Sequence, residues 1–199
     1  MSFAGTRHQP ANILQMRKVI AAFNMTLDGI CDHTTGIADD ELHEHYSELI
    51  DHAGVILYGR ITFQLMQFWQ DLLAQPSGKK SLDRFAISID RTPKLVFSTT
   101  MEETYWNTAT LSDLPLREKI LKLKQEPGRD ILVGSRSLII QLLNNHLIDE
   151  FQICIHPLIE GNGLRLFDEI RESINLKLLK TKILTSGTVV CYYQPNQEK

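Results

Sequence analysis

The sequence lacks the features of a membrane protein, a disulfide-rich secreted protein or a nucleic-acid-binding protein. No apolar run approaches the ~18 residues of a membrane span, and residues 1–15 have no apolar core of a secretory signal. The chain has three cysteines, an odd number, which we interpret as reduced and mostly buried. Its 21 Lys and Arg against 24 Asp and Glu give a net charge of −3, which argues against a nucleic-acid partner. We therefore expect a cytoplasmic protein without membrane or nucleic-acid contacts.

Several catalytic and binding motifs are also missing. The chain has no Cys-x-x-Cys pair and no His-Glu-x-x-His, and His43 and His45 fall on different faces of a predicted helix, so we expect no metal site. No Gly-x-Ser-x-Gly turn supports a hydrolase with a nucleophile elbow. Neither Gly-x-Gly-x-x-Gly nor Gly-x-x-x-x-Gly-Lys occurs, which excludes the Rossmann and P-loop nucleotide motifs.

The 199 residues fit one domain of the usual ~100–200 residues. We expect this domain to span 16–195, after an N-terminal extension at 1–15 that is flexible and before a tail at 196–199. The extension has no hydrophobic periodicity, whereas Met16 leads straight into an apolar run of strand length. The alternative is that residues 1–15 form an arm that packs on a neighbouring subunit.

The apolar pattern predicts alternating strands and helices, followed by an antiparallel tail. Helical periodicity separates runs of strand length, which gives strands at 19–23, 55–58, 93–98 and 130–133 and helices at 40–53, 60–69, 82–89, 115–125 and 138–143. Alternation then marks a strand at 151–155, and 176–184 and 189–193 flank a Ser186-Gly187 turn as a hairpin. We therefore predict an α/β fold with a mixed, mostly parallel central sheet, helices on both faces and an antiparallel C-terminal hairpin.

Two strand-to-helix turns have the same form, an apolar strand followed by glycine, polar residues and a helix. Glycine lets a phosphate approach the backbone, and the helix N-terminus offers unpaired N–H groups. Arginines could pair with phosphate oxygens and hydroxyls could donate to them. The alternative is that glycine only shapes each turn and Ser or Thr caps the helix. The candidate phosphate ligands are Gly59, Arg60, Thr62, Gly134, Ser135, Arg136 and Ser137.

Asp28 directly follows the first predicted strand, in Leu27-Asp28-Gly29. Ligands of open α/β sheets bind beyond the carboxyl ends of the strands, so Asp28 could contact a substrate or a cofactor. The alternative is an ordinary Asp-Gly turn.

Short segments with these signals follow one another along most of the chain, at 25–29, 57–63, 96–100, 131–135, 147–151, 156–163 and 166–167. Their order and spacing resemble the dihydrofolate-reductase-like superfamily, and within it the reductase domain of the bifunctional riboflavin-biosynthesis deaminase–reductase and its stand-alone relatives. The resemblance implies a three-layer fold around a central sheet, an NADPH-dependent reductase and a homodimer.

The resemblance also implies roles for individual residues. The two glycine turns would hold the cofactor phosphates, and Ser98 and Thr99 would lie near the adenosine 2′-phosphate. Residues 24–29 would line the nicotinamide and a small-molecule substrate, with Asn24, Thr26 and Asp28 as substrate ligands. Asp28 would orient the substrate or relay a proton.

The chain departs from the family pattern at several points. Thr99 stands where many relatives have Arg, which leaves NADPH or NADH open, and Gly134-Ser135 stands where dihydrofolate reductases have Gly-Gly. The Pro-Trp pair after the first strand and the zinc-dependent deaminase half are absent. The identity of the substrate therefore stays open.

We predict a reductase that uses NADPH, with NADH not excluded, and transfers hydride to a pyrimidine-ribosyl or pteridine-like small molecule. The alternative is a non-catalytic nucleotide-binding protein that kept the fold. The C-terminal strands carry more apolar residues than one domain face can cover, which also favours a homodimer: Leu176, Leu178, Ile183, Val189, Cys191 and Tyr193.

Overall fold

The structure is a computed structural model that describes residues 16–196. The expected extension at 1–15 and residues 197–199 of the expected tail lie outside the described residues. The elements follow in the order β1 (Val19–Thr26), α1 (Asp40–His52), β2 (Val55–Gly59), α2 (Arg60–Met66), α3 (Phe68–Ala74), α4 (Lys80–Arg91), β3 (Lys94–Phe97), β4 (Ala109–Leu111), α5 (Leu116–Gln125), β5 (Ile131–Val133), α6 (Arg136–Leu143), β6 (Glu150–His156), β7 (Leu176–Ile183) and β8 (Val189–Pro195).

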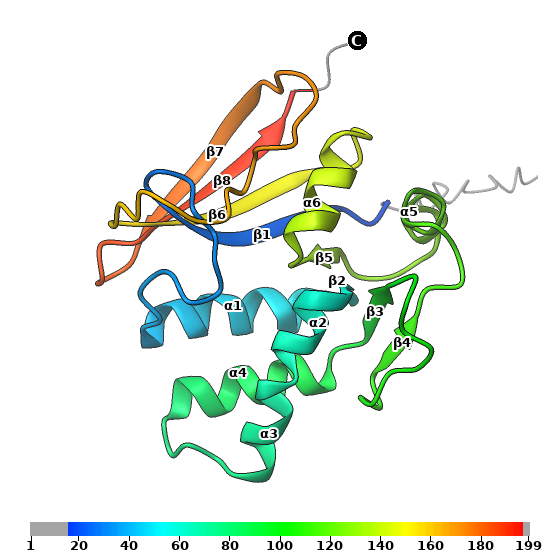
Figure 1. The fold of residues 1–199 in the computed structure, drawn as a ribbon, viewed down its shortest axis with the longest axis horizontal. Coiled ribbons are helices and arrows are strands. Elements are labelled where there is room, and N and C mark those ends of the chain that lie inside the picture. Colours follow the sequence, from blue (N-terminus) through cyan, green and yellow to red (C-terminus); the bar gives the residue numbers. More distant parts are fainter. Residues whose placement is uncertain (1–15, 197–199) are drawn as a thin grey trace, which may run out of the picture.

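The eight strands form one sheet in the order β4-β3-β2-β5-β1-β6-β8-β7. The strands from β4 to β6 pair in parallel, and β8 and β7 add antiparallel pairs at one edge. Figure 1 shows this edge on the opposite side of the molecule from β3 and β4. The predicted mixed, mostly parallel sheet with an antiparallel C-terminal hairpin is confirmed. All the parallel strands therefore end at the same edge of the sheet, where ligands of such folds bind.

Strand alternation sends side chains into two separate cores, one on each face of the sheet. In β1, Val19 and Ala21 face the side of α5 and α6, whereas Ile20 and Ala22 face the side of α1, α2 and α4. The helices α1, α3 and α4 gather together in the lower half of Figure 1. Both faces of the sheet are thus covered by helices, which is the predicted three-layer arrangement.

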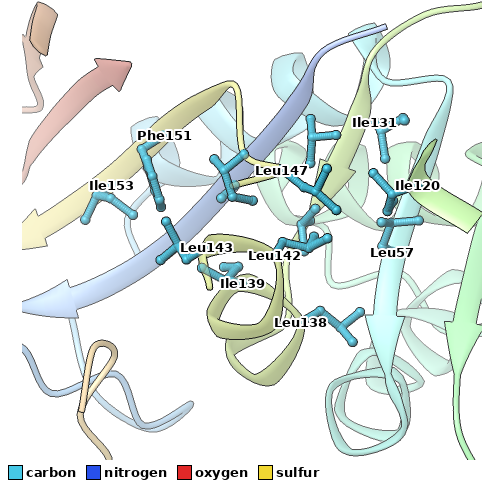
Figure 2. Close-up of a cluster of buried hydrophobic side chains, with 14 of the residues drawn as sticks. Leu57, Ile120, Ile131, Leu138, Ile139, Leu142, Leu143, Leu147, Phe151 and Ile153 are labelled. Atoms are coloured by element: carbon cyan, nitrogen blue, oxygen red, sulfur yellow. The ribbon is translucent and has the colours of Figure 1, made fainter. Parts of the chain in front are cut away.

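Helix α6 shows how a short apolar stripe fixes the position of a turn. Four of its five buried residues recur at helical spacing and pack in one cluster against the sheet, as Figure 2 shows: Leu138, Ile139, Leu142 and Leu143. They meet Leu57 of β2 and Phe151 of β6 in one cluster. This packing holds the N-terminus of α6 beside the carboxyl end of β2.

Some elements differ from the sequence-based expectations. The helix expected from Arg60 through Trp69 is two helices that meet at Gln67, and Trp69 then packs on Phe85 of α4 with ring centroids 4.5 Å apart. Strand β4 was not predicted, because three residues paired to one neighbour are too short to show alternation. Helix α4 extends beyond the expected 82–89 at both ends.

Two further observations concern the cysteines and the helix lengths. All three cysteines are buried and none forms a disulfide bond, as the odd number and wide spacing suggested. Among residues 16–196, no helix is both long and apolar enough to cross a membrane.

Candidate functional site

A cavity of about 710 Å³ opens at the edge of the sheet where the parallel strands end. Its walls come from the turn after β2, the turn after β3, the segment between β4 and α5, and the start of α6. The lining residues are Gly59, Arg60, Ile61, Thr62, Phe97, Ser98, Thr99, Thr100, Ser112, Asp113, Leu114, Pro115, Leu116, Ser137, Leu138 and Gln141.

Three helices begin at this cavity. Residues from the first turns of α2, α5 and α6 line it, and none of the three has a side chain that caps its N-terminus. The unpaired N–H groups of a helix N-terminus and its positive dipole end both favour an anion. The cavity is therefore suited to a ligand with more than one phosphate.

The two glycine turns predicted from the sequence touch each other. The N–H of Gly59 donates to Ser135 Oγ at 2.8 Å, and Ser135 is fully buried. A Cβ placed on Gly59 would lie 3.2 Å from Ser137 Oγ. The φ of Gly59 is −80°, which any residue can adopt, so the need for glycine here is steric. Ser135 thus joins the two turns.

The two candidate phosphate-binding arginines have different surroundings. Arg60 is exposed, and its side chain makes one long hydrogen bond, 3.3 Å from Nη1 to Gln64 Oε1. Arg136 instead pairs with the carboxylates of Asp168 and Glu169 and donates from Nε to the Arg165 carbonyl at 2.6 Å. Arg60 can therefore turn toward a ligand, whereas Arg136 fastens the segment 165–169 to the start of α6.

Ser98 and Thr99 lie in the turn after β3. Ser98 Oγ accepts from the N–H groups of Thr100 and Met101, at 3.1 and 3.0 Å, and so shapes the turn. Thr99 is exposed to solvent at the cavity wall. The turn offers hydroxyl groups to a ligand and no cationic side chain.

The polar residues at the end of β1 are largely engaged with the protein itself. Thr26 is fully buried; its hydroxyl donates to Asp28 Oδ1 at 2.6 Å and accepts from the Ile30 N–H at 3.0 Å. Asn24 Oδ1 accepts from the Tyr46 hydroxyl at 3.0 Å. These bonds fix the turn that carries Asp28.

Asp28 connects this turn to a distant loop. Its carboxylate accepts from the N–H groups of Glu160 and Gly161, at 3.2 and 2.8 Å. The hydrogen bonds from the Thr26 hydroxyl and from the Gly161 N–H lower the pKa of Asp28 to about 2. Asp28 is therefore an ionised hydrogen-bond acceptor at neutral pH.

The predicted site residues thus fall into three groups. Six of the predicted cofactor ligands line the cavity: Gly59, Arg60, Thr62, Ser98, Thr99 and Ser137. Three are not among its lining residues: Gly134, Ser135 and Arg136. The third group, at the end of β1, lies outside the lining as well: Asn24, Thr26 and Asp28. In residues 16–196, no group of three or more His, Cys, Asp or Glu side chains could hold a metal ion.

The cavity wall at 112–116 was not predicted from the sequence. The sequence feature that marks this wall is Pro115. A proline directly before an apolar helical stripe is typical of a helix N-terminus. Because strand β4 had not been predicted, nothing placed this helix start at the same edge as the other turns.

A smaller cavity of about 170 Å³ lies near the amino ends of β1 and β6. Its lysines are paired with its carboxylates, Lys18 with Glu150 and Lys124 with Asp149. Because these charged groups are already paired with one another, this cavity is a weaker candidate for a ligand site than the larger one.

Comparison with known proteins finds similarity along nearly the whole chain. The profile of a family described as RibD C-terminal domain matches residues 17–191. The uncharacterized protein YyaP of Bacillus subtilis (strain 168) is 34% identical over 191 residues, which are 93% of this chain and 98% of YyaP.

Solved structures share the fold at lower identity. A Shewanella sp. PV-4 protein, whose name points to riboflavin biosynthesis, superposes with a TM-score of 0.69 at 19% identity over 90% of this chain and 99% of that one. A Thermotoga maritima deaminase/5-amino-6-(5-phosphoribosylamino)uracil reductase gives 0.64 at 18% identity over 91% of this chain and 57% of that one. Dihydrofolate reductase from Enterococcus faecalis gives 0.60 at 12% identity over 90% and 97%. These likenesses confirm the dihydrofolate-reductase-like fold.

Proposed function

The chain belongs to the RibD C-terminal domain family, and we propose that it is a reductase that transfers hydride from NADPH to a small molecule, with NADH not excluded. The observation that carries this proposal is the cavity at which three helix N-termini meet. A dinucleotide has the phosphates that such N-termini favour. The Enterococcus faecalis dihydrofolate reductase that shares the fold was solved with NADP(H), which supports the choice of ligand.

The order of the strands supports an elongated ligand. From the end of β1 to the end of β4 the sheet passes β5, β2 and β3, a span of about 19 Å at ~4.8 Å between strands. We assign the nicotinamide to the end of β1, near residues 24–29. The adenosine then falls over β3 and β4, and the phosphates between them contact Gly59, Arg60, Thr62 and Ser137.

The remaining predicted residues hold the turns and loops around the cavity in place. In this proposal Ser135 joins the two glycine turns, and Arg136 holds the segment 165–169 in place. Asp28 positions the loop at 160–161 and accepts hydrogen bonds from the substrate as a carboxylate. The hydride chemistry belongs to the cofactor, and the protein contributes position and electrostatic field.

We propose a pyrimidine-ribosyl or pteridine-like molecule as the hydride acceptor. The names of the Thermotoga maritima and Enterococcus faecalis proteins, a uracil-derivative reductase and a dihydrofolate reductase, support these two classes. The alternative is a non-catalytic protein that binds the nucleotide, because a fold does not fix a function. Oxidation of NADPH in the presence of such acceptors separates the two: binding without turnover favours the alternative.

Calorimetric titration with NADPH tests the binding site. Arg60→Ala should weaken binding by about 1.5–3 kcal/mol, because a charge-assisted hydrogen bond to phosphate is lost. Gly59→Val should abolish binding while circular dichroism shows a folded chain, because its side chain meets Ser137 and fills the approach to the turn.

An exposed arginine away from the cavity provides the control. Arg171→Ala should leave NADPH affinity unchanged. Unaltered affinity in Arg60→Ala at low salt, where the charge contribution is largest, would remove Arg60 from the site. A wild-type chain that binds neither NADPH nor NADH would overturn the proposed function.

We further propose that the chain forms a homodimer through its C-terminal strands. Every residue of β7 is exposed, although the strand carries several large apolar side chains. A second copy would cover them.

A further inference from the structure

Charge is sparse in the lining of the large cavity, and it is unevenly placed. Among the described residues that line it, the charged ones are Arg60 and Asp113. Arg60 follows β2, whereas Asp113 follows β4 at the edge of the sheet. Figure 1 shows β4 and the start of α5 at the side of the molecule away from β7. Under the proposed function this is the adenosine end of the cavity.

Asp113 lines the cavity and is paired with a lysine that does not. Lys119 Nζ lies 2.7 Å from Asp113 Oδ1. The Asp113 side chain is 70% exposed and the Lys119 side chain 18% exposed, and Asp113 is a lining residue whereas Lys119 is not. A ligand at this end therefore contacts the residue that bears the carboxylate, while the paired lysine lies outside the lining.

The chemistry of the adenosine ribose makes this arrangement selective. A carboxylate accepts a hydrogen bond from a ribose 2′-hydroxyl, and it repels a 2′-phosphate, which needs a cationic partner. The other polar side chains in the lining at this end carry hydroxyls, on Ser98, Thr99, Thr100 and Ser112, which can bond to either form of the ribose. The carboxylate is thus the side chain at this end that opposes a 2′-phosphate.

We infer that Asp113 is a specificity-determining residue that lowers the affinity for NADPH relative to NADH. Lys119 is the cation that Asp113 neutralises, and it becomes available to a 2′-phosphate when the carboxylate is removed. The inference rests on the proposed function and assigns to Asp113 the discrimination between a 2′-hydroxyl and a 2′-phosphate on the ribose.

Calorimetric titration with NADPH and with NADH at low salt tests this inference. Asp113→Asn keeps the shape of the side chain and should tighten NADPH binding about three- to tenfold, since a repulsive charge is lost and an ammonium is freed. The affinity for NADH should stay the same or fall. The double variant Asp113→Asn with Lys119→Met should lose the gain for NADPH, and added salt should shrink it.

Asp71→Asn is the matched control, because Asp71 is an exposed carboxylate on α3 outside the cavity lining. It should leave the ratio of the two dissociation constants unchanged. If Asp113→Asn leaves that ratio unchanged, or if Asp71→Asn shifts it as much, the inference is wrong while the proposed function stands. If the wild-type chain binds neither nucleotide, the proposed function fails and the inference falls with it.

Discussion

Thr26 and Ser135 show how single buried hydroxyl groups shape the turns of the site. Both residues are fully buried. The Thr26 hydroxyl donates to Asp28 and accepts from the Ile30 N–H, and the Ser135 hydroxyl accepts from the Gly59 N–H. Each satisfies a backbone donor that would otherwise be left unpaired inside the protein, at a cost of about 1–3 kcal/mol. Arg60 and Thr99, in contrast, are exposed at the cavity, where their side chains can move toward a ligand.

The sequence indicated which polar residues at these turns belong to the site, but it did not indicate their hydrogen-bond partners. A polar residue after a strand can point at a ligand or back at the chain, and the sequence pattern is the same for both. Arg136 is the clearest example, since its carboxylate partners Asp168 and Glu169 lie 32 and 33 residues away in the chain. Nothing in the local pattern around Arg136 indicates them.

His45 is a buried titratable group that should make the fold sensitive to acid. It is 5% exposed, its Nε2 has no hydrogen-bond partner among the described residues, and its ring lies against Tyr46 and Tyr192. Burial, and then the charge of Lys182, lower the pKa of His45 to about 4. The folded chain therefore resists protonation at this position.

The sign of the pH effect follows from the two states. Between pH 6.5 and about 4 the unfolded chain takes up a proton at His45 and the folded chain does not, so the free energy of unfolding falls as the pH falls through this window. The full loss is on the order of 3 kcal/mol. His45→Phe should remove this loss, so urea melts at pH 7 and pH 4.5 should differ less than for the wild type.

An exposed histidine serves as the control for this prediction. His33→Gln should keep the wild-type difference between the two pH values, because His33 is exposed to solvent. An unchanged pH dependence in a folded His45→Phe protein would show that other groups cause the acid sensitivity.

At the scale of elements, the segment between β1 and α1 is held against the end of β6. The Ile37 N–H donates to His156 Nδ1 at 3.1 Å, and the Thr188 hydroxyl lies 3.2 Å from the same atom. His156 is 1% exposed. Gly36, with a φ of +111°, lies against this ring. The fixed ring therefore sets the path of the loop that leads from the Asp28 turn into α1.

Gly36→Ala should strain this loop in two ways. A Cβ at Gly36 would lie 2.8 Å from His156 Nε2, and the positive φ disfavours any side chain. Because the ring is buried and hydrogen-bonded, it cannot move away cheaply, and we expect a loss of about 2–4 kcal/mol in the free energy of unfolding. Chemical denaturation measures it.

Gly78→Ala separates the two contributions. Gly78 also has a positive φ, +77°, but a Cβ there meets nothing within 4 Å. We expect this variant to lose about 1–2 kcal/mol from the backbone alone. Equal losses at the two positions would contradict the packing of Gly36 against His156.

The elements themselves could be predicted to the extent that they show periodicity. Helix α6 and strands β1, β2 and β5 have buried stripes or unbroken apolar runs, and the structure confirms them. Strand β4 has three residues and one neighbour, so its sequence is indistinguishable from a loop. Because strand β4 was not predicted, the position of Asp113, which follows it, at the cavity was not predicted either.

At the scale of the whole molecule, the strand order is what creates the cavity. The turns after β2 and β5 come together because these strands are neighbours, although 76 residues separate Gly59 from Ser135. The predicted fold class implied a shared carboxyl edge but not which turns would be adjacent. The resemblance to a known family implied that both glycine turns hold one cofactor, and the hydrogen bond from Gly59 to Ser135 shows that the two turns are adjacent.

The same strand order leaves β7 at an edge with an apolar face that nothing in the described chain covers. Leu178 lies opposite Tyr193 and Ile183 lies opposite Val189, so these side chains share one face of the sheet. Leu178 is 51% and Ile183 74% exposed. An edge strand with an exposed apolar face is a template for association.

We therefore expect light scattering at micromolar concentration to give about twice the chain mass of 22.8 kDa. The double variant Leu178→Lys with Ile183→Lys places two charges on the shared face and should give the monomer mass with the fold retained, because neither side chain is buried in one chain. Ile87→Lys is the control: Ile87 is 52% exposed on α4, on the opposite face of the sheet, and its variant should stay dimeric. A wild-type chain with the monomer mass would refute the dimer, and a dimer that survives both lysines would move the interface away from β7.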